Sequence, residues 1–195
     1  MSGDDEQRVP PGADMQGYLR ELAEFVGFDD ADAAAIRASA PAVLHHEEAL
    51  TTALYDHFLR FPATARFFLG PDGAPDRARI ERRKHSLARW LGETAQAALS
   101  HEYAYYLLSM GIAHSHRDYG PGGRIPPQFM VAAMSLTQTA LAAIFRDEMG
   151  DPARALAASM AWNKLLLLNL NALLVGYLLP PRTPPREPAG PRSAS

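Results

Sequence analysis

His114 is the residue whose type and setting first suggest a chemical role. Met110, Leu107 and Tyr103 lie four, seven and eleven positions before it, so the four side chains share one face of a helix. An imidazole that ends an apolar stripe is a hydrogen-bonded core residue, a metal ligand or the ligand of a haem iron. The stripe by itself favours the core residue and leaves the two ligand roles open.

Tyr55 is the second candidate, because it lies on an apolar helical face with Leu54, Phe58 and Leu59. A phenol in that setting needs a partner for its hydroxyl. The hydroxyl either reaches solvent or donates a hydrogen bond inside the protein, and the sequence weighs the two equally. Opposite an axial histidine, Tyr55 would place one polar group in an otherwise apolar slot.

The spacing of the histidines and glycines gives little support for a zinc site or a phosphate-binding loop. His114 and His116 would point to nearly opposite sides of a helix, and His45 and His46 are adjacent. No two histidines have the His-x-x-x-His spacing that places a pair of imidazoles on one zinc ion. The glycine- and proline-rich loops at 70–75 and 120–123 follow no expected strand, so they do not form a phosphate-binding loop.

The composition excludes further classes of protein. The chain has 195 residues, a net charge of −3 and no cysteine. The absence of cysteine rules out disulfides, thiolate zinc sites, iron–sulfur clusters and covalently attached c-type haem. The negative charge argues against a nucleic-acid partner. Because the start of the chain is acidic and lacks an apolar run, it does not read as a signal peptide, and we expect a cytoplasmic protein.

The helical period dominates the chain, and strand alternation is absent. Asp76 and Asp151 are expected caps, and Pro41 suits the first turn of a helix. We expect an all-α domain of about seven or eight helices over residues 15–180, with disordered segments at 1–14 and 181–195. The expected helices cover about 15–26, 29–39, 41–62, 76–95, 101–119, 126–145 and 152–179.

Residues 156–179 approach the length of a membrane span and carry one charge, Lys164. Asn163, Asn169 and Asn171 interrupt the run. A helix that is apolar on most sides is more typical of a central core helix or a subunit interface than of a membrane span. We therefore expect no membrane partner.

Several runs together resemble the protoglobins and the globin domains of globin-coupled sensors. Their order and spacing carry the resemblance, which covers about residues 15–179 and favours the protoglobins. It implies a globin fold, a 3-on-3 helical sandwich with an extra N-terminal helix, and a non-covalent haem b. The runs are Leu54-Tyr-Asp-His-Phe-Leu-Arg-Phe-Pro62, Phe67-Phe-Leu-Gly-Pro-Asp-Gly-Ala-Pro75, His85-Ser-Leu-Ala-Arg-Trp-Leu91, Met110-Gly-Ile-Ala-His114, Ile125-Pro-Pro-Gln-Phe129 and Ala161-Trp-Asn-Lys164.

Carried over by position, the resemblance makes His114 the proximal ligand of the haem iron and Tyr55 the distal residue that hydrogen-bonds a bound gas. His116 lies nearby, but the Gly-x-x-His spacing and the apolar stripe both select His114. Arg83, Lys84 and Arg89 are candidate partners for the haem propionates, although a place on the solvated surface is the more common use of such side chains. The remaining expected pocket residues are Leu87, Trp90, Met110, Phe129, Ala133 and Met134.

Four positions depart from the family pattern. Leu54 lies where protoglobins have tryptophan, and Leu87 and Ala133 lie where an aromatic side chain is often found. Ser115 follows the candidate proximal histidine where protoglobins often have a second histidine. Because smaller groups replace large ones, the resemblance does not fix the size of the distal pocket or the route of ligand entry.

The resemblance implies reversible binding of O2, CO and NO at a pentacoordinate iron, in a gas carrier or sensor. A haem enzyme that consumes NO or peroxynitrite, and a haem-free regulatory globin module, remain alternatives. The chain shows no reductase domain and only 16 residues after Leu179, so we expect gas binding rather than self-sufficient catalysis, with any signal passed through a separate partner or its own assembly. Similarity to dimeric protoglobins implies a homodimer through the last two helices.

Overall fold

Residues 12–181 are described by the computed structural model, and within them the chain folds into eight α-helices and two short 3-10 helices. No strand forms in this range, although an isolated bridge pairs Leu69 with Pro75. The expected all-α fold is confirmed. The elements are α1 (Met15–Phe25), α2 (Asp30–His45), α3 (Glu47–Arg60), α4 (Pro62–Ala65), η1 (Arg66–Phe68), α5 (Arg77–Ala95), α6 (His101–His116), η2 (Gly120–Gly122), α7 (Pro127–Glu148) and α8 (Pro152–Leu178).

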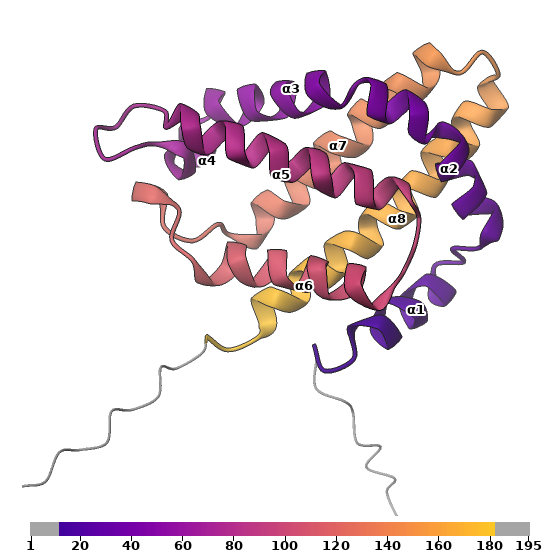
Figure 1. Ribbon diagram of the computed structural model, residues 1–195, viewed down its shortest axis with the longest axis horizontal. Helices are drawn as coiled ribbons and strands as arrows, with labels where there is room; N and C mark the ends of the chain where they lie inside the picture. The colour runs from indigo at the N-terminus through magenta and orange to yellow at the C-terminus, as the bar shows by residue number, and fades with distance from the viewer. Residues whose placement is uncertain (1–11, 182–195) are drawn as a thin grey trace, which may run out of the picture.

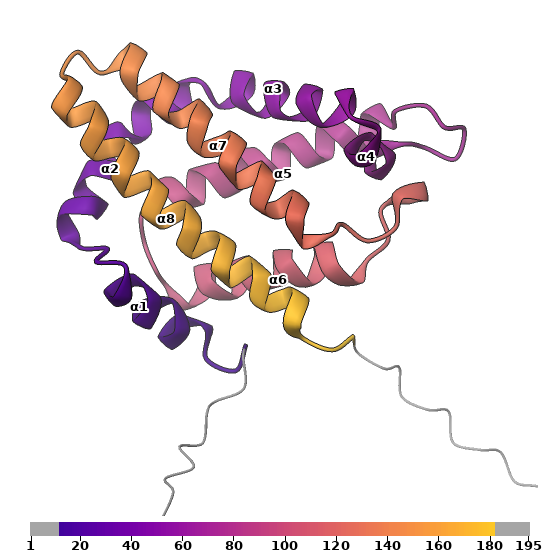
Figure 2. The same cartoon turned by 180° about the vertical axis from the view of Figure 1, so that it is seen from behind.

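The helices pack in two layers with α1 outside them (Figure 1). One layer, nearer the viewer in Figure 1, contains α2, α5 and α6. The other contains α3, α7 and α8 and is seen from its own side in Figure 2. The central helix α8 packs most extensively on α6 and α7, and α1 packs on α6 and α8. This is the globin sandwich with an additional N-terminal helix.

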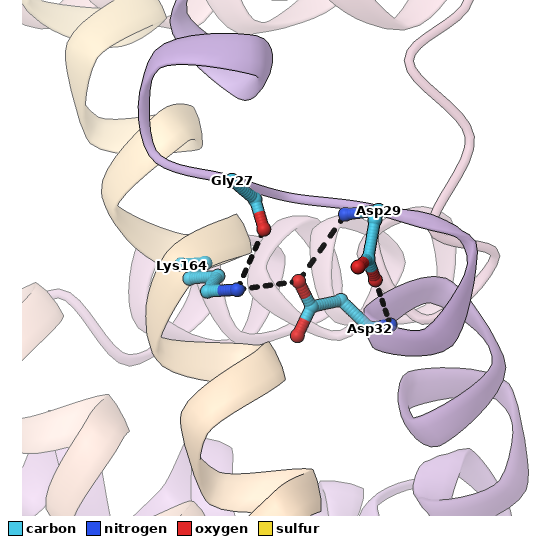
Figure 3. Close-up of polar contacts among 4 residues, drawn as sticks. All are labelled: Gly27, Asp29, Asp32 and Lys164. Carbon is cyan, nitrogen blue, oxygen red and sulfur yellow. Dashed lines mark hydrogen bonds and ion pairs between the residues drawn. The ribbon is translucent and has the colours of Figure 1, made fainter.

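An ion pair from α8 holds the start of α2. The Lys164 ammonium lies 2.7 Å from the carbonyl oxygen of Gly27 and 2.6 Å from a carboxylate oxygen of Asp32 (Figure 3). The same carboxylate accepts from the backbone N–H of Asp29, while the Asp29 side chain accepts from the N–H of Asp32. Two donors at the helix start are thereby satisfied in a capping box.

A second contact joins α2 to α8 inside the core. The indole Nε1 of Trp162 donates to the hydroxyl of Ser39 at 2.9 Å, and both side chains are buried. Lys164 and Trp162, from the segment that resembles the family, therefore position the N-terminal helices against α8 rather than contribute to a pocket.

The expected helix boundary at Pro41 is wrong. α2 continues through Pro41 to His45, and α3 begins at Glu47. Proline removes one hydrogen bond, to the carbonyl of Arg37, and normally ends a helix. Here Pro41 and Arg37 are exposed, whereas Ala40 and Val43 on either side of the proline are buried. Packing of the buried face sustains the helix past the proline.

α7 and α8 differ in how they use their apolar residues. Both are long and apolar enough to cross a membrane by length and composition. The most apolar window of α8 is 61% buried, while that of α7 is 17% buried. α8 is therefore a core helix, as expected, whereas most of the large apolar side chains of α7 are only partly buried.

The disorder expected at residues 1–14 and 181–195 concerns mainly residues outside the described range. Asp14 belongs to the first of these segments but lies within the described range. It caps α1, because its carboxylate accepts a hydrogen bond from the N–H of Gly17.

Candidate functional site

A largely apolar cavity of about 340 Å³ lies between the two layers. Its walls come mainly from α3, η1, α5, α6 and α7 and from the segment that joins α6 to α7, with one residue each from α4 and α8. Ligand pockets in proteins span roughly 300–1,000 Å³, so a ligand larger than a diatomic gas is accommodated. Ten residues expected from the sequence line the cavity: Tyr55, Arg83, Leu87, Arg89, Trp90, Met110, His114, Phe129, Ala133 and Met134.

His114 presents one ring nitrogen for coordination. Its Nδ1 lies 2.6 Å from the carbonyl oxygen of Met110. Because a carbonyl oxygen only accepts, Nδ1 carries the proton and Nε2 keeps its lone pair. Burial lowers the pKa of His114 below its usual range; the bond to Met110 opposes this and the charge of Arg83 adds to it. The imidazole is therefore neutral near pH 7, which is the form that binds a metal.

A close helix crossing fixes the position of His114. A Cβ placed on Gly111 would overlap the carbonyl of Leu173, and one on Gly176 would overlap the backbone of Gly111. Only glycine allows α6 and α8 to approach this closely. Ser115 adds a hydrogen bond from its hydroxyl to the carbonyl of Gly176 at 3.0 Å. The last turn of α6 is therefore held rigidly against the core helix.

Tyr55 lies on α3 with only 8% of its surface exposed. Its ring makes edge contacts with Phe58 and Phe68, at centroid distances of 5.8 and 5.4 Å. Burial raises the pKa of Tyr55 well above its usual range, and Arg83 opposes this shift only in part. The phenol is therefore protonated and able to donate a hydrogen bond.

A second cavity of about 260 Å³ adjoins the first. Leu54, Leu87, Trp90 and Thr137 line both. Leu54 and Leu87 are two of the positions where the sequence carries smaller side chains than the family pattern, and their size leaves this side of the molecule loosely filled. The cavity extends between α3, α5 and α7 toward Arg60.

The candidate cations differ in their placement. Arg83 and Arg89 line the cavity. Lys84 does not; its ammonium pairs with Glu81 at 3.0 Å. α5, which carries all three, begins where the Asp76 carboxylate accepts from the N–H of Arg79, as the sequence predicts.

Sequence reasoning missed two parts of the cavity wall. Phe67 and Phe68 come from η1, which the sequence identified only as an aromatic turn. Tyr119 lies five positions after His114, beyond the end of α6, and its ring stacks on the imidazole with centroids 5.8 Å apart. The one signal for Tyr119 was an aromatic residue directly before a glycine-rich loop.

A family model described as Protoglobin matches residues 16–179. The chain belongs to the protoglobin family. Membership implies that this protoglobin binds haem and takes part in haem-based binding or sensing of gas. A comparison with curated protein sequences gives no match.

Solved structures show the same fold at low sequence identity. The globin domain of a Geobacter sulfurreducens globin-coupled sensor is 22% identical, with a TM-score of 0.68, over 81% of this chain and 96% of that one. The ferric globin domain of E. coli DosC is 16% identical, with a TM-score of 0.61, over 82% of this chain and 97% of that one.

The cavity suits the haem that the family implies. His114 offers a neutral nitrogen at the wall of an apolar space, and Tyr55 offers one polar hydrogen from another helix. Among the described residues, no group of three histidine, cysteine, aspartate or glutamate side chains gathers to hold a bare metal ion. The donor set is one imidazole in an apolar slot, which is the set a haem iron requires.

Proposed function

We propose that this protoglobin is a b-type haem protein that reversibly binds O2, CO and NO as a gas carrier or sensor. One observation carries the proposal: His114 presents an unprotonated Nε2 at the wall of a cavity that Tyr55 also lines. Bound haem would supply an iron with an open sixth position for a diatomic ligand.

His114 acts as the proximal ligand. The bond from Nδ1 to the Met110 carbonyl fixes both the tautomer and the ring orientation, as the outer partners of metal-binding histidines generally do. The glycine crossing of α6 on α8 resists displacement of the ring. The chain therefore provides a pre-oriented ligand.

Tyr55 acts as the distal donor. Its hydroxyl donates a hydrogen bond to a polar diatomic ligand, while CO gains much less from such a bond. In a dry pocket the bond is worth about 1–3 kcal/mol. Most of the side chains around it are apolar, so few protein groups compete for the hydroxyl.

Absorption spectra of the purified protein test the proposal. Ferric, dithionite-reduced and CO-bound samples are compared for the natural protein, His114→Ala and His116→Ala. We expect a Soret band that shifts on reduction and again with CO. The band is lost in His114→Ala and returns with added imidazole. His116→Ala is the matched control, because its ring bonds to the carbonyl of Leu179 instead, and its spectra stay natural.

A well-folded protein without a Soret band, even after haem is added, would contradict the proposal and leave a haem-free regulatory module. Turnover of NO in the presence of O2 and a reductant would instead favour an enzyme.

We further propose that two copies pair through α7 and α8. Four apolar side chains of α8 are between 41% and 76% exposed, and Val131 of α7 is 48% exposed. Large exposed apolar surface is typical of contact sites. The four residues of α8 are Leu156, Met160, Leu167 and Leu178.

Sedimentation at micromolar concentration tests the pairing. We expect a dimer for the natural protein and a monomer for Met160→Glu/Leu167→Glu. Phe25→Glu is the control, because Phe25 is 86% exposed but lies on α1, and this variant stays dimeric. A natural protein that sediments only as a monomer would contradict the proposal.

A further inference from the structure

Arg83 and Tyr119 meet at one edge of the haem cavity. Arg83 comes from α5, and Tyr119 from the segment between α6 and α7. The guanidinium carbon of Arg83 lies 4.7 Å from the centroid of the Tyr119 ring. The His114 imidazole also stacks on the Tyr119 ring, with an interplanar angle of 22°. Arginine and tyrosine are therefore held in a fixed relation to the proximal ligand.

The hydroxyl of Tyr119 has no hydrogen-bond partner among the described residues, although the side chain is 5% exposed. A buried hydroxyl without a partner is costly, so native proteins rarely leave one. Because Tyr119 also lines the cavity, we expect its hydroxyl to bond to a ligand bound in the cavity.

Backbone contacts hold the segment around Tyr119 in place, so the ring does not readily turn out to solvent. Its N–H donates to the carbonyl of Gly123 at 2.8 Å, and its carbonyl accepts from Gly122. A Cβ on Gly122 would overlap the backbone of Arg66, and Gly120 takes a positive φ of 53° against the carbonyl of Leu69. Glycine alone permits this contact between η2 and η1.

Arg83 is a cation of the cavity wall that has no ion pair among the described residues. The ion pairs on α5 join Arg79 to Asp76, Lys84 to Glu81 and Arg89 to Glu93, and among the described residues they leave Arg83 without a carboxylate. An arginine in this position suits a planar anion, because its guanidinium forms paired hydrogen bonds with a carboxylate.

The cavity opens at this cluster into a basic hollow. Arg83, Ser86 and Tyr119 line both the cavity and the hollow. The hollow adds two arginines and a single carboxylate, that of Asp118. The balance of charge favours an anionic group where the apolar cavity meets the surface. The full lining of the hollow is Arg79, Arg82, Arg83, Ser86, Asp118, Tyr119 and Gly120.

We propose that Tyr119 and Arg83 form a carboxylate clamp that binds a haem propionate. The inference rests on the proposed function. The Tyr119 hydroxyl donates one hydrogen bond to the carboxylate, and the Arg83 guanidinium supplies the charge. Because Tyr119 also stacks on His114, the clamp ties the propionate edge of the haem to the proximal ligand and selects one orientation of the haem in the pocket.

Haem transfer from the ferric protein to excess apomyoglobin tests the clamp. Tyr119→Phe, Arg83→Gln and the control Lys84→Gln are each loaded with protohaem or with its dimethyl ester, which lacks the carboxylates. With protohaem, we expect about tenfold faster loss from Tyr119→Phe and from Arg83→Gln, and no change in Lys84→Gln. With the dimethyl ester, all three variants should match the natural protein within about twofold.

Equal acceleration with protohaem and with the ester would overturn the clamp, because a merely structural role of Tyr119 or Arg83 does not depend on the carboxylate. Rates of haem loss equal to that of the natural protein in both Tyr119→Phe and Arg83→Gln would overturn it too. Either result is distinct from failure of the proposed function, in which the natural protein takes up no haem through His114.

Discussion

The two walls of the cavity differ in how closely their helices pack. On the His114 side, α6 touches the backbone of α8 at Gly111 and Gly176, and Ser115 adds a hydrogen bond across the crossing. On the Tyr55 side, α3, α5 and α7 leave a second cavity of about 260 Å³ lined by Leu54 and Leu87. One wall is closed by backbone contact, while the other leaves space between the side chains of three helices.

The difference separates two requirements of one site. A metal ligand must be held in a fixed place, and close-packed backbone transmits any change of volume as strain. A gas must enter and leave, which needs space and tolerates changes of side-chain size. The two walls therefore predict opposite responses to the same kind of substitution.

The largest expected effect is that of Gly111→Ala. The new methyl group would overlap the carbonyl of Leu173, which is backbone and cannot rotate away. We expect the free energy of unfolding to fall by about 3 kcal/mol, at the upper end for overpacking. Urea unfolding monitored by circular dichroism measures it. Because His114 lies one turn further along α6, haem loss should also quicken.

Unchanged stability in Gly111→Ala would show that α6 and α8 separate without cost. The rigid proximal wall would then be wrong as an explanation of how His114 is positioned.

Tyr55→Phe should have the next largest effect, on the ligand rather than on the fold. Removal of the hydroxyl leaves the apolar contacts with Phe58 and Phe68 in place. We expect O2 to dissociate about tenfold faster or more, with little change for CO. Stopped-flow kinetics measures the dissociation rates of O2 and of CO. The control is Tyr106→Phe, which alters another tyrosine of the same cavity; equal O2 dissociation in all three proteins would remove Tyr55 from the mechanism.

Leu54→Trp/Leu87→Phe fills the loose wall. Both positions line the two cavities at once, so larger side chains narrow the space between them. We expect CO association to slow by roughly severalfold, an added barrier of about 1 kcal/mol, while the fold is retained. Flash photolysis measures the rate. Association as fast as in the natural protein would mean that gas reaches the iron by another route.

Much of this contrast could be predicted from the sequence. The apolar stripe singled out His114 and an apolar helical face singled out Tyr55, and the resemblance supplied their roles; both line the cavity. The expected caps Asp76 and Asp151 accept hydrogen bonds at the starts of α5 and α8. These features depend on local spacing and on chemistry within one turn of helix, which a sequence displays directly.

The rest depends on contacts between distant segments. Pro41 was expected to begin a helix, yet burial of the residues around it keeps α2 intact. Lys84 and Arg83 are neighbours in sequence, and only the arginine faces the cavity because each points to a different side of α5. Tyr119 carries only a weak local signal, an aromatic residue before a glycine-rich loop, because its role follows from how the loop folds back beside His114.

Gly92→Ala is the smallest expected effect and has the opposite sign to Gly111→Ala. Gly92 lies within α5, and a Cβ there meets no atom within 4 Å. Alanine forms helix more readily than glycine, because the unfolded chain loses less conformational freedom on folding. We expect a gain of about 0.5–1 kcal/mol in the free energy of unfolding, measured beside Gly111→Ala. A loss at both glycines would mean that α5 is as tightly constrained as α6, and the distinction between a rigid proximal wall and a tolerant distal wall would fail.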